Sequence, residues 1–68
     1  MEYKVRFLGP AVVPTGLEEK IRQAVDAQSV DSLMDLQLFF VFDDMGREWM
    51  GFSQPEDETV EVEDVFEP

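Results

Sequence analysis

Apolar and basic side chains alternate over residues 2–8 of the chain. This period-2 pattern is typical of a strand with one buried face. The apolar positions of that strand are Tyr3, Val5 and Phe7. Gly9 and Pro10 end the strand, and residues 10–14 carry proline at both ends. Because proline restricts the preceding residue to extended geometry, we expect an extended, partly buried connector here rather than a helix.

A helix is predicted directly after this connector. Thr15-Gly-Leu-Glu18 matches a capping box, in which the Thr15 hydroxyl accepts a hydrogen bond from the Glu18 amide. Glu18 is also spaced for an ion pair with Arg22. We therefore expect a helix that begins at Thr15 and packs an apolar stripe on a sheet. The stripe of 3.6-residue period consists of Leu17, Ile21, Ala24 and Val25, with Gln28 extending it.

Two further strands are predicted in the middle of the chain. Serine and aspartate are frequent at residues 29–35, which indicates a turn. The apolar anchors of this turn are Val30, Leu33 and Met34. Residues 36–42 alternate as a strong strand, and the turn residues at 43–47 include a glycine suited to positive φ. We therefore expect a hairpin that leads from this strand into a third strand at residues 48–53.

The acidic C-terminal segment, residues 54–68, is either a fourth strand or a disordered tail. Residues 53–58 break the sheet pattern, and alternation resumes at residues 59–63. A block of like charges resists compaction, but we favour the strand because the segment is more apolar than a solvating tail requires. Its apolar residues are Val60, Val62, Val65 and Phe66.

The predicted order of elements is β-α-β-β with an optional fourth β. At 68 residues the chain is expected to form a single domain, residues 1–68. The order indicates an α+β fold, in which one helix packs on one face of a small, mainly antiparallel or mixed sheet.

Alternation at residues 36–42 also predicts which side chains face the helix. We expect the side chains that point toward it to be Leu36, Leu38, Phe40 and Phe42. The opposite face then carries an apolar surface of the kind that marks an interaction site, made of Phe39, Val41, Trp49 and Phe52. Two alternatives remain open. Either this face binds another protein or a second copy of the chain, or residues 10–14 and Phe66 fold back over it.

Charge is distributed unevenly along the chain. The sequence holds 5 basic and 16 acidic residues, for a net charge of −11. The segment 54–68 holds seven acidic residues and no basic residue. Direct binding to nucleic acid or to an anionic membrane needs the opposite sign, so neither is expected. The expected partner is a protein with a basic surface.

The available residue types disfavour catalysis and cofactor binding. The chain contains no cysteine and no histidine. It therefore lacks the usual ligands of zinc, haem and iron–sulfur clusters, and the usual base for a serine nucleophile. It also lacks a glycine-rich phosphate-binding motif and an EF-hand loop. We expect no enzyme activity, no cofactor and no metal site. No secretory signal or membrane-spanning stretch is visible, so the expected location is cytoplasmic.

The spacing of the carboxylates suggests one functional hypothesis. In a strand, Glu61 and Glu63 would project from one face roughly 6.6–6.8 Å apart. Such a row resembles a run of phosphates, so it could occupy the basic groove of a nucleic-acid-binding protein. The other carboxylates of this predicted surface are Asp43, Asp44, Glu56, Asp57, Glu58 and Asp64, with Glu67 in the same zone.

Our first hypothesis is therefore an inhibitor that acts by DNA or RNA mimicry. Phages and other mobile elements make small acidic proteins of this type against nucleases and CRISPR effectors. The alternative is a protein-interaction or assembly module that uses the apolar face, with another protein or as a homodimer. An acidic segment that only keeps the protein soluble also stays open. The affinity of a mimic should fall steeply with salt, whereas an apolar interface should tolerate salt.

Overall fold

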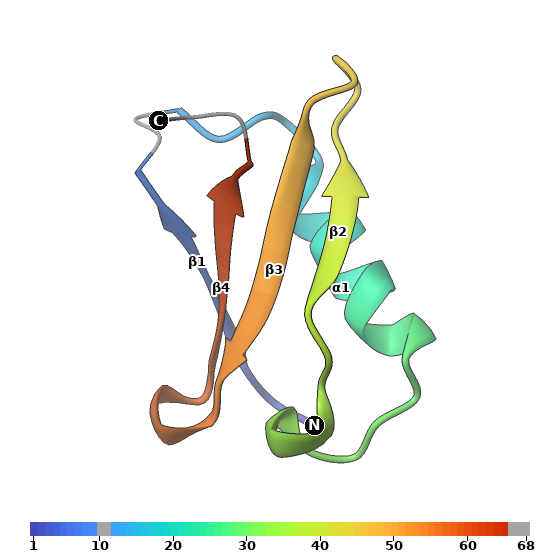
Figure 1. Cartoon of the computed structure of the whole chain (residues 1–68), viewed down its shortest axis with the longest axis vertical. Helices are drawn as coiled ribbons and strands as arrows, with labels where there is room; N and C mark the ends of the chain where they lie inside the picture. The colour runs from blue at the N-terminus through green and yellow to red at the C-terminus, as the bar shows by residue number, and fades with distance from the viewer. Residues whose placement is uncertain (10–11, 66–68) are drawn as a thin grey trace.

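One α-helix packs against one face of a four-stranded sheet in the computed structural model, which describes residues 1–9 and 12–65 (Figure 1). The strands are β1 (Lys4–Leu8), β2 (Phe39–Phe42), β3 (Glu48–Gln54) and β4 (Thr59–Asp64). The helices are α1 (Leu17–Ala27) and two 3-10 helices, η1 (Leu33–Asp35) and η2 (Pro55–Asp57). The predicted element order and the fourth strand are confirmed, and the fold belongs to the α+β class.

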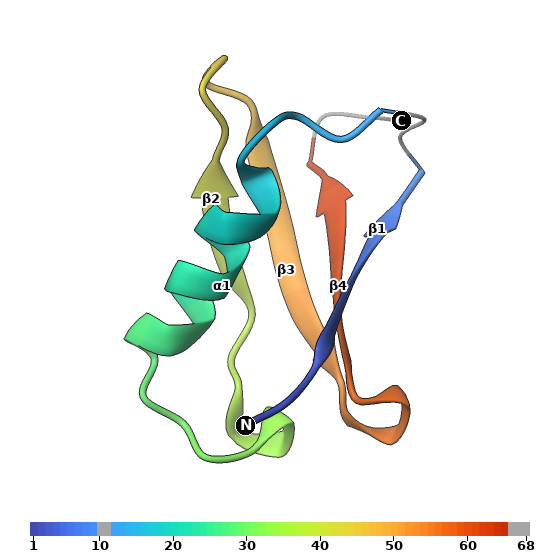
Figure 2. The same cartoon turned by 180° about the vertical axis from the view of Figure 1, so that it is seen from behind.

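The strands lie in the order β1-β4-β3-β2, so β1 and β2 form the two edges of the sheet. β1 pairs with β4 in parallel, whereas β3 pairs antiparallel with both β2 and β4. The sheet is therefore mixed, which is one of the two arrangements predicted. Figures 1 and 2 show α1 on one face only, and the described residues place no second α-helix over the opposite face.

The start of α1 differs from the predicted capping box. The helix begins at Leu17, and its N-cap is Gly16 with a φ of 83° and no side-chain cap. Glycine adopts this left-handed conformation readily because it has no Cβ. The amide of Leu17 donates to the carbonyl of Pro14 at 3.2 Å, so the connector satisfies the first free amide of the helix. The cap predicted at Thr15 is wrong because the chain enters the helix through Gly16.

The apolar stripe of α1 packs into the core as predicted. Leu17, Ile21 and Val25 are almost completely buried, while Glu18 pairs with Arg22 at 3.1 Å on the outer side. The remaining buried apolar residues come from the η1 region and the sheet, and they are Leu33, Leu36, Phe39, Trp49, Val60 and Val62. Burying one such side chain is worth about 1.5–3 kcal/mol, so this cluster is the main source of stability.

The turn predicted at residues 29–35 contains η1. The hydroxyl of Ser32 accepts a hydrogen bond from the amide of Met34 at 3.1 Å and caps this short helix. Of the predicted anchors, Leu33 is buried, Val30 packs at the edge of the core, and Met34 is 80% exposed. The chain then enters β2 by way of Leu36, which is also buried.

The predicted orientation of β2 is wrong, because its two faces are reversed. Phe39 and Trp49 are buried, at 9% and 2% exposure, and Val41 packs against the same core. β2 begins at Phe39, so strand alternation does not extend back to Leu36. Leu36 enters the core from the end of η1, and Phe39 enters it three residues later. The side chains that consequently remain exposed are Leu38, Phe40 and Phe42.

Candidate protein-interaction surface

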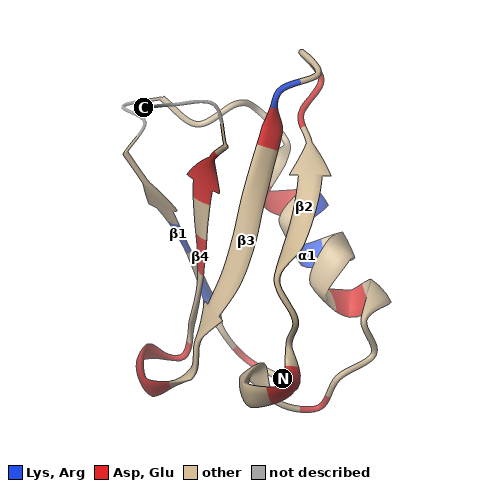
Figure 3. Ribbon diagram, viewed as in Figure 1, with Lys and Arg blue, Asp and Glu red and all other residues tan. Residues whose placement is uncertain are grey.

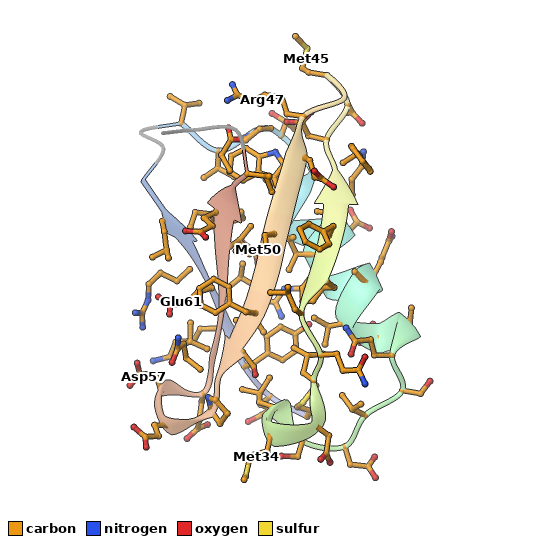
Figure 4. The ribbon with its side chains drawn as sticks, viewed as in Figure 1. Met34, Met45, Arg47, Met50, Asp57 and Glu61 are labelled. Atoms are coloured by element: carbon orange, nitrogen blue, oxygen red, sulfur yellow. The ribbon has the colours of Figure 1, made fainter. Side chains whose placement is uncertain are left out.

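The sheet face opposite α1 carries an apolar surface, which we call the open face. It consists of Phe40 and Phe42 from β2 and Met50 and Phe52 from β3, and Leu38 flanks it. Phe40 lies opposite Met50 in the register, so their side chains are neighbours. Leu38, Phe40 and Phe42 are 55%, 50% and 58% exposed. Figure 4 shows Met50 in the middle of this face.

Charged side chains border the open face on β4 and β1. Met50 lies opposite Glu63, and Phe52 lies opposite Glu61, so both glutamates share one face as their spacing predicted. Arg6 lies opposite Glu61 in the parallel pair, with its Nη1 3.3 Å from Oε2 of Glu61. From β2 to β1, the face therefore changes from apolar to acidic to basic.

The carboxylates of the open face are not all neutralised. The Glu61 side chain is 12% exposed because it pairs with Arg6. Glu48 and Glu63 are half-buried, and neither forms an ion pair within residues 1–9 and 12–65. Glu48 lies opposite Phe42 and is a diagonal neighbour of Glu63 across β3 and β4, at about 7–8 Å. Two uncompensated negative charges thus stand beside the apolar residues.

A buried carboxylate anchors the hairpin between β2 and β3. Asp43 accepts hydrogen bonds from the amides of Met45 at 2.8 Å and Arg47 at 3.0 Å, and from Nε1 of Trp49 at 2.9 Å. The Trp49 hydrogen bond is the main reason that the pKa of Asp43 lies below its usual value of 3.8, despite the opposing effect of burial. Asp43 is 6% exposed, so it contributes little to the predicted acidic surface.

Two more carboxylates of the predicted acidic surface have cations beside them. Asp64 forms an ion pair with Arg47, and its side chain is 5% exposed. Asp44 is 81% exposed, and Nζ of Lys20 lies 2.7 Å from its Oδ1. Asp64 is therefore largely withdrawn from solvent, whereas Asp44 is accessible but partly neutralised.

The remaining predicted carboxylates, Glu56, Asp57 and Glu58, are exposed around η2. Figure 3 shows the acidic turn between β3 and β4, drawn red, at the end of the sheet opposite the hairpin tip. Nη2 of Arg6 is 3.9 Å from Oδ2 of Asp57. The predicted acidic residues therefore divide between the two ends of the sheet, with the two glutamates of β4 between them, and they do not form one compact row.

Part of the predicted cover of an apolar face lies outside the described residues. Pro10, Ala11, Phe66 and Glu67 fall there, so the prediction that Phe66 and the start of the connector fold over the sheet stays a prediction. Within the described part of the connector, Val12 is 80% exposed. That side chain therefore buries little of its apolar surface.

Lys20 of α1 and Gln28, the C-cap residue of α1, bond to the backbone at the end of β2 and just before its start. Gln28 exchanges two hydrogen bonds with the backbone of Gln37, at 3.1 Å and 2.9 Å. Nζ of Lys20 donates to the carbonyl oxygen of Phe42 at 3.4 Å. Free strand edges invite pairing with other chains, and these contacts leave only a short stretch of β2 available for it.

Other features of the described residues offer less to a ligand. An open depression of about 340 Å³ lies between the first residues, η1 and η2, and its lining includes Met1, Met34 and Glu58. Within residues 1–9 and 12–65, no three carboxylates are grouped so that they could hold a metal ion. No helix in the same part of the chain is long and apolar enough to cross a membrane.

Comparison with protein-family models, curated proteins and solved structures finds no match to this chain. Its function is therefore inferred from the surface chemistry of the fold itself.

Sequence reasoning predicted an apolar surface opposite the helix, but of its four residues only Phe52 lies on the open face, although Gly51 carries a signal for the true orientation of β2. A glycine inside a strand often marks the close approach of another group. Here the ring of Phe39 lies on Gly51, and a Cβ at that position would be 2.6 Å from Cε2 and 2.8 Å from Cε1 of the ring. The pairing of Gly51 with a large side chain places Phe39 in the core, and Phe40 must then point outward.

Proposed function

We propose that this protein is a small protein-binding module that contacts its partner through the open face. The observation that carries the proposal is the exposure of Phe40 and Phe42, which lie on the sheet face opposite α1. Monomeric proteins rarely expose contiguous apolar patches of this kind unless the patch binds something. Aromatic and methionine side chains are also enriched in the cores of protein interfaces, and the open face is built from these types.

In this proposal the acidic residues select the partner. The net charge of −11 attracts proteins with basic surfaces and repels acidic ones. Charge complementarity increases the rate of encounter and excludes wrong partners more than it raises affinity. The apolar residues of the open face therefore supply most of the binding free energy.

Affinity capture from a lysate of the source cells tests the proposal. The bait is compared with Phe40→Ser/Phe42→Ser, which removes exposed apolar surface, and with Glu56→Gln/Glu58→Gln, which changes η2 and its C-cap residue. We expect the wild type and the η2 variant to retain the same protein, and the aromatic variant to lose it. Retention by an aromatic variant whose thermal unfolding matches that of the wild type would refute the proposal.

A nucleic-acid mimic is the second candidate, and it is favoured by the exposed Glu56 and Glu58 together with Glu63, which forms no ion pair within residues 1–9 and 12–65. In this form the protein inhibits a nuclease or a CRISPR effector by occupying its basic groove. Such a complex would dissociate as salt is raised, would be displaced by competing DNA, and would weaken in Glu56→Gln/Glu58→Gln. The η2 variant and a salt series therefore separate the two candidates.

A further inference from the structure

The open face combines apolar and acidic side chains in a defined pattern. Phe42 lies opposite Glu48, and Met50 lies opposite Glu63, so each of these carboxylates borders an apolar side chain. Both carboxylates are half-buried, and the described residues provide no cation within ion-pair distance of either. Charges near apolar surface are screened less by water, so they interact more strongly with a cation that arrives there.

A second copy of the chain fits this pattern poorly. A twofold interface uses the same patch on both subunits. Two open faces packed together would therefore enclose Glu48 and Glu63 of both copies in one interface. Each copy also carries a net charge of −11. Like charges across an interface cost free energy, so a face-to-face homodimer is disfavoured.

Addition of a strand at the β2 edge is also a poor fit. Gln28 and Lys20 already bond the backbone at the two ends of that edge. A partner strand that paired along the whole edge would have to displace these side chains. A segment that lies on the open face leaves all of these contacts intact.

We infer that the open face binds a basic amphipathic segment of another protein. This inference rests on the proposed function and specifies the chemistry of the partner. An arginine or lysine of the segment lies between Glu48 and Glu63, whose Cα atoms are about 7–8 Å apart as diagonal neighbours. Both side chains project from the same face, and one guanidinium offers five N–H donors in a planar fork, enough to hydrogen-bond to both carboxylates.

Apolar side chains of the same segment cover the remainder of the open face. They pack on Phe40 and Met50, which are neighbours across β2 and β3. The cation of the segment also lies against the ring of Phe42, where the negative face of the aromatic ring attracts it. A peptide that is only basic would contact the carboxylates and not the apolar side chains, and a peptide that is only apolar would do the reverse.

Selection from a library of short random peptides, with the full chain as bait, tests the inference. The selected peptides are then titrated against the wild type, Glu48→Gln/Glu63→Gln and Phe40→Ser/Phe42→Ser. Glu56→Gln/Glu58→Gln is the matched control, because it removes the same charge from η2. Thermal unfolding and analytical ultracentrifugation establish that each variant is folded and give its oligomeric state.

We expect basic and apolar residues to be enriched together in the selected peptides. Glu48→Gln/Glu63→Gln should weaken binding about tenfold, as the loss of two partly screened charge contacts allows. The η2 control should weaken it less than about twofold, because exposed charges at a distance are screened by salt. Phe40→Ser/Phe42→Ser should abolish measurable binding.

Several results would overturn the inference. The inference is refuted if the selected peptides need Phe40 and Phe42 but contain no excess of basic residues. It is also refuted if they bind Glu48→Gln/Glu63→Gln as tightly as the wild type. Either result leaves the proposed function standing. Peptides indifferent to the two aromatic residues refute both, as does the failure to select any peptide. A dimer that Phe40→Ser/Phe42→Ser abolishes would identify a second copy as the occupant and refute the inference.

Discussion

Phe39 and Phe40 are neighbours in β2 and have opposite surroundings. Phe39 is 9% exposed, with its ring on Gly51 in the core beneath α1. Phe40 is 50% exposed on the open face, beside Met50. Because side chains alternate along a strand, one residue step moves an identical side chain from one face of the sheet to the other. The same residue type thus stabilises the fold on one face and, in our proposal, binds a partner on the other.

Carboxylates differ between the two faces in the same way. Asp64 lies opposite Trp49 on the face that α1 covers, where it pairs with Arg47, and Asp43 hydrogen-bonds to Trp49 nearby. Glu48 and Glu63, on the open face, have no cation beside them among the described residues. The covered face is therefore satisfied within the chain, whereas the open face retains groups that a partner can satisfy.

Trp49→Ala tests the covered face and should have the largest effect on stability. Trp49 is 2% exposed, contacts the ring of Phe7 edge-on at 6.4 Å between centroids, and donates to Asp43. Truncating such a residue costs about 3–5 kcal/mol, which is comparable to the whole stability of a domain of this size. We expect a largely unfolded chain by circular dichroism. A loss below about 1 kcal/mol in urea denaturation would contradict the assignment of this face.

Gly51→Ala tests how closely the ring of Phe39 approaches β3, and its effect should be the next largest. The added methyl group would overlap the ring, and such overpacking costs about 1–3 kcal/mol. In the double variant Gly51→Ala/Phe39→Leu, the smaller side chain should relieve part of this loss, which a double-mutant cycle of urea midpoints measures. Strictly additive losses would show that the two residues do not touch.

The pH dependence of stability tests the role of Asp43 at the covered end of the sheet. Its pKa lies below 3.8 in the folded protein, so its contribution is present above that pH and is lost as the pH falls through the lower folded value. The free energy of unfolding of the wild type should therefore decrease as the pH is lowered below about 4. Asp43→Asn cannot titrate and should show a shallower decline. Equal slopes for Asp43→Asn and the wild type would disprove this role.

Phe40→Ser tests the open face and should have the smallest effect on stability. Half of the Phe40 side chain is already exposed, so its loss should change the free energy of unfolding by less than about 1 kcal/mol. Phe39→Ser, one residue away, should behave like a core truncation and unfold the chain. Urea denaturation of the two variants measures the difference between the faces. Similar losses in the free energy of unfolding for both variants would show that the two faces do not differ.

Local patterns in the sequence were sufficient to predict most of the elements. Leu17, Ile21 and Val25 mark the buried stripe of α1, and Val60 and Val62 mark the buried face of β4. Each of these patterns depends on spacing within one element, which the sequence displays directly.

The orientation of β2 could not be predicted in the same way. Alternation shows which side chains share a face, but it does not show which face the helix covers. Leu36 misled the prediction because it is buried from η1 and not from the strand. The one-residue difference in phase exchanges the two faces.

The candidate site was predicted only in part. The co-facial position of Glu61 and Glu63 followed from strand alternation. The pairing of Arg6 with Glu61 joins residues 55 positions apart, and the sequence carries no local signal for it. Such long-range contacts decide which carboxylates remain available to a partner, so the acidic surface expected from the sequence differs from the one in the fold.

The methionine methyl groups provide the most direct test of the open face. Met50 lies in the middle of this face, whereas Met34 and Met45 are exposed at η1 and at the hairpin tip (Figure 4). In protein labelled with ¹³C at the methionine methyl groups, a basic amphipathic peptide from the selection should shift the Met50 signal and leave Met34 and Met45 unchanged. Shifts at Met34 or Met45 with an unchanged Met50 signal would contradict the claim that the open face is the binding surface.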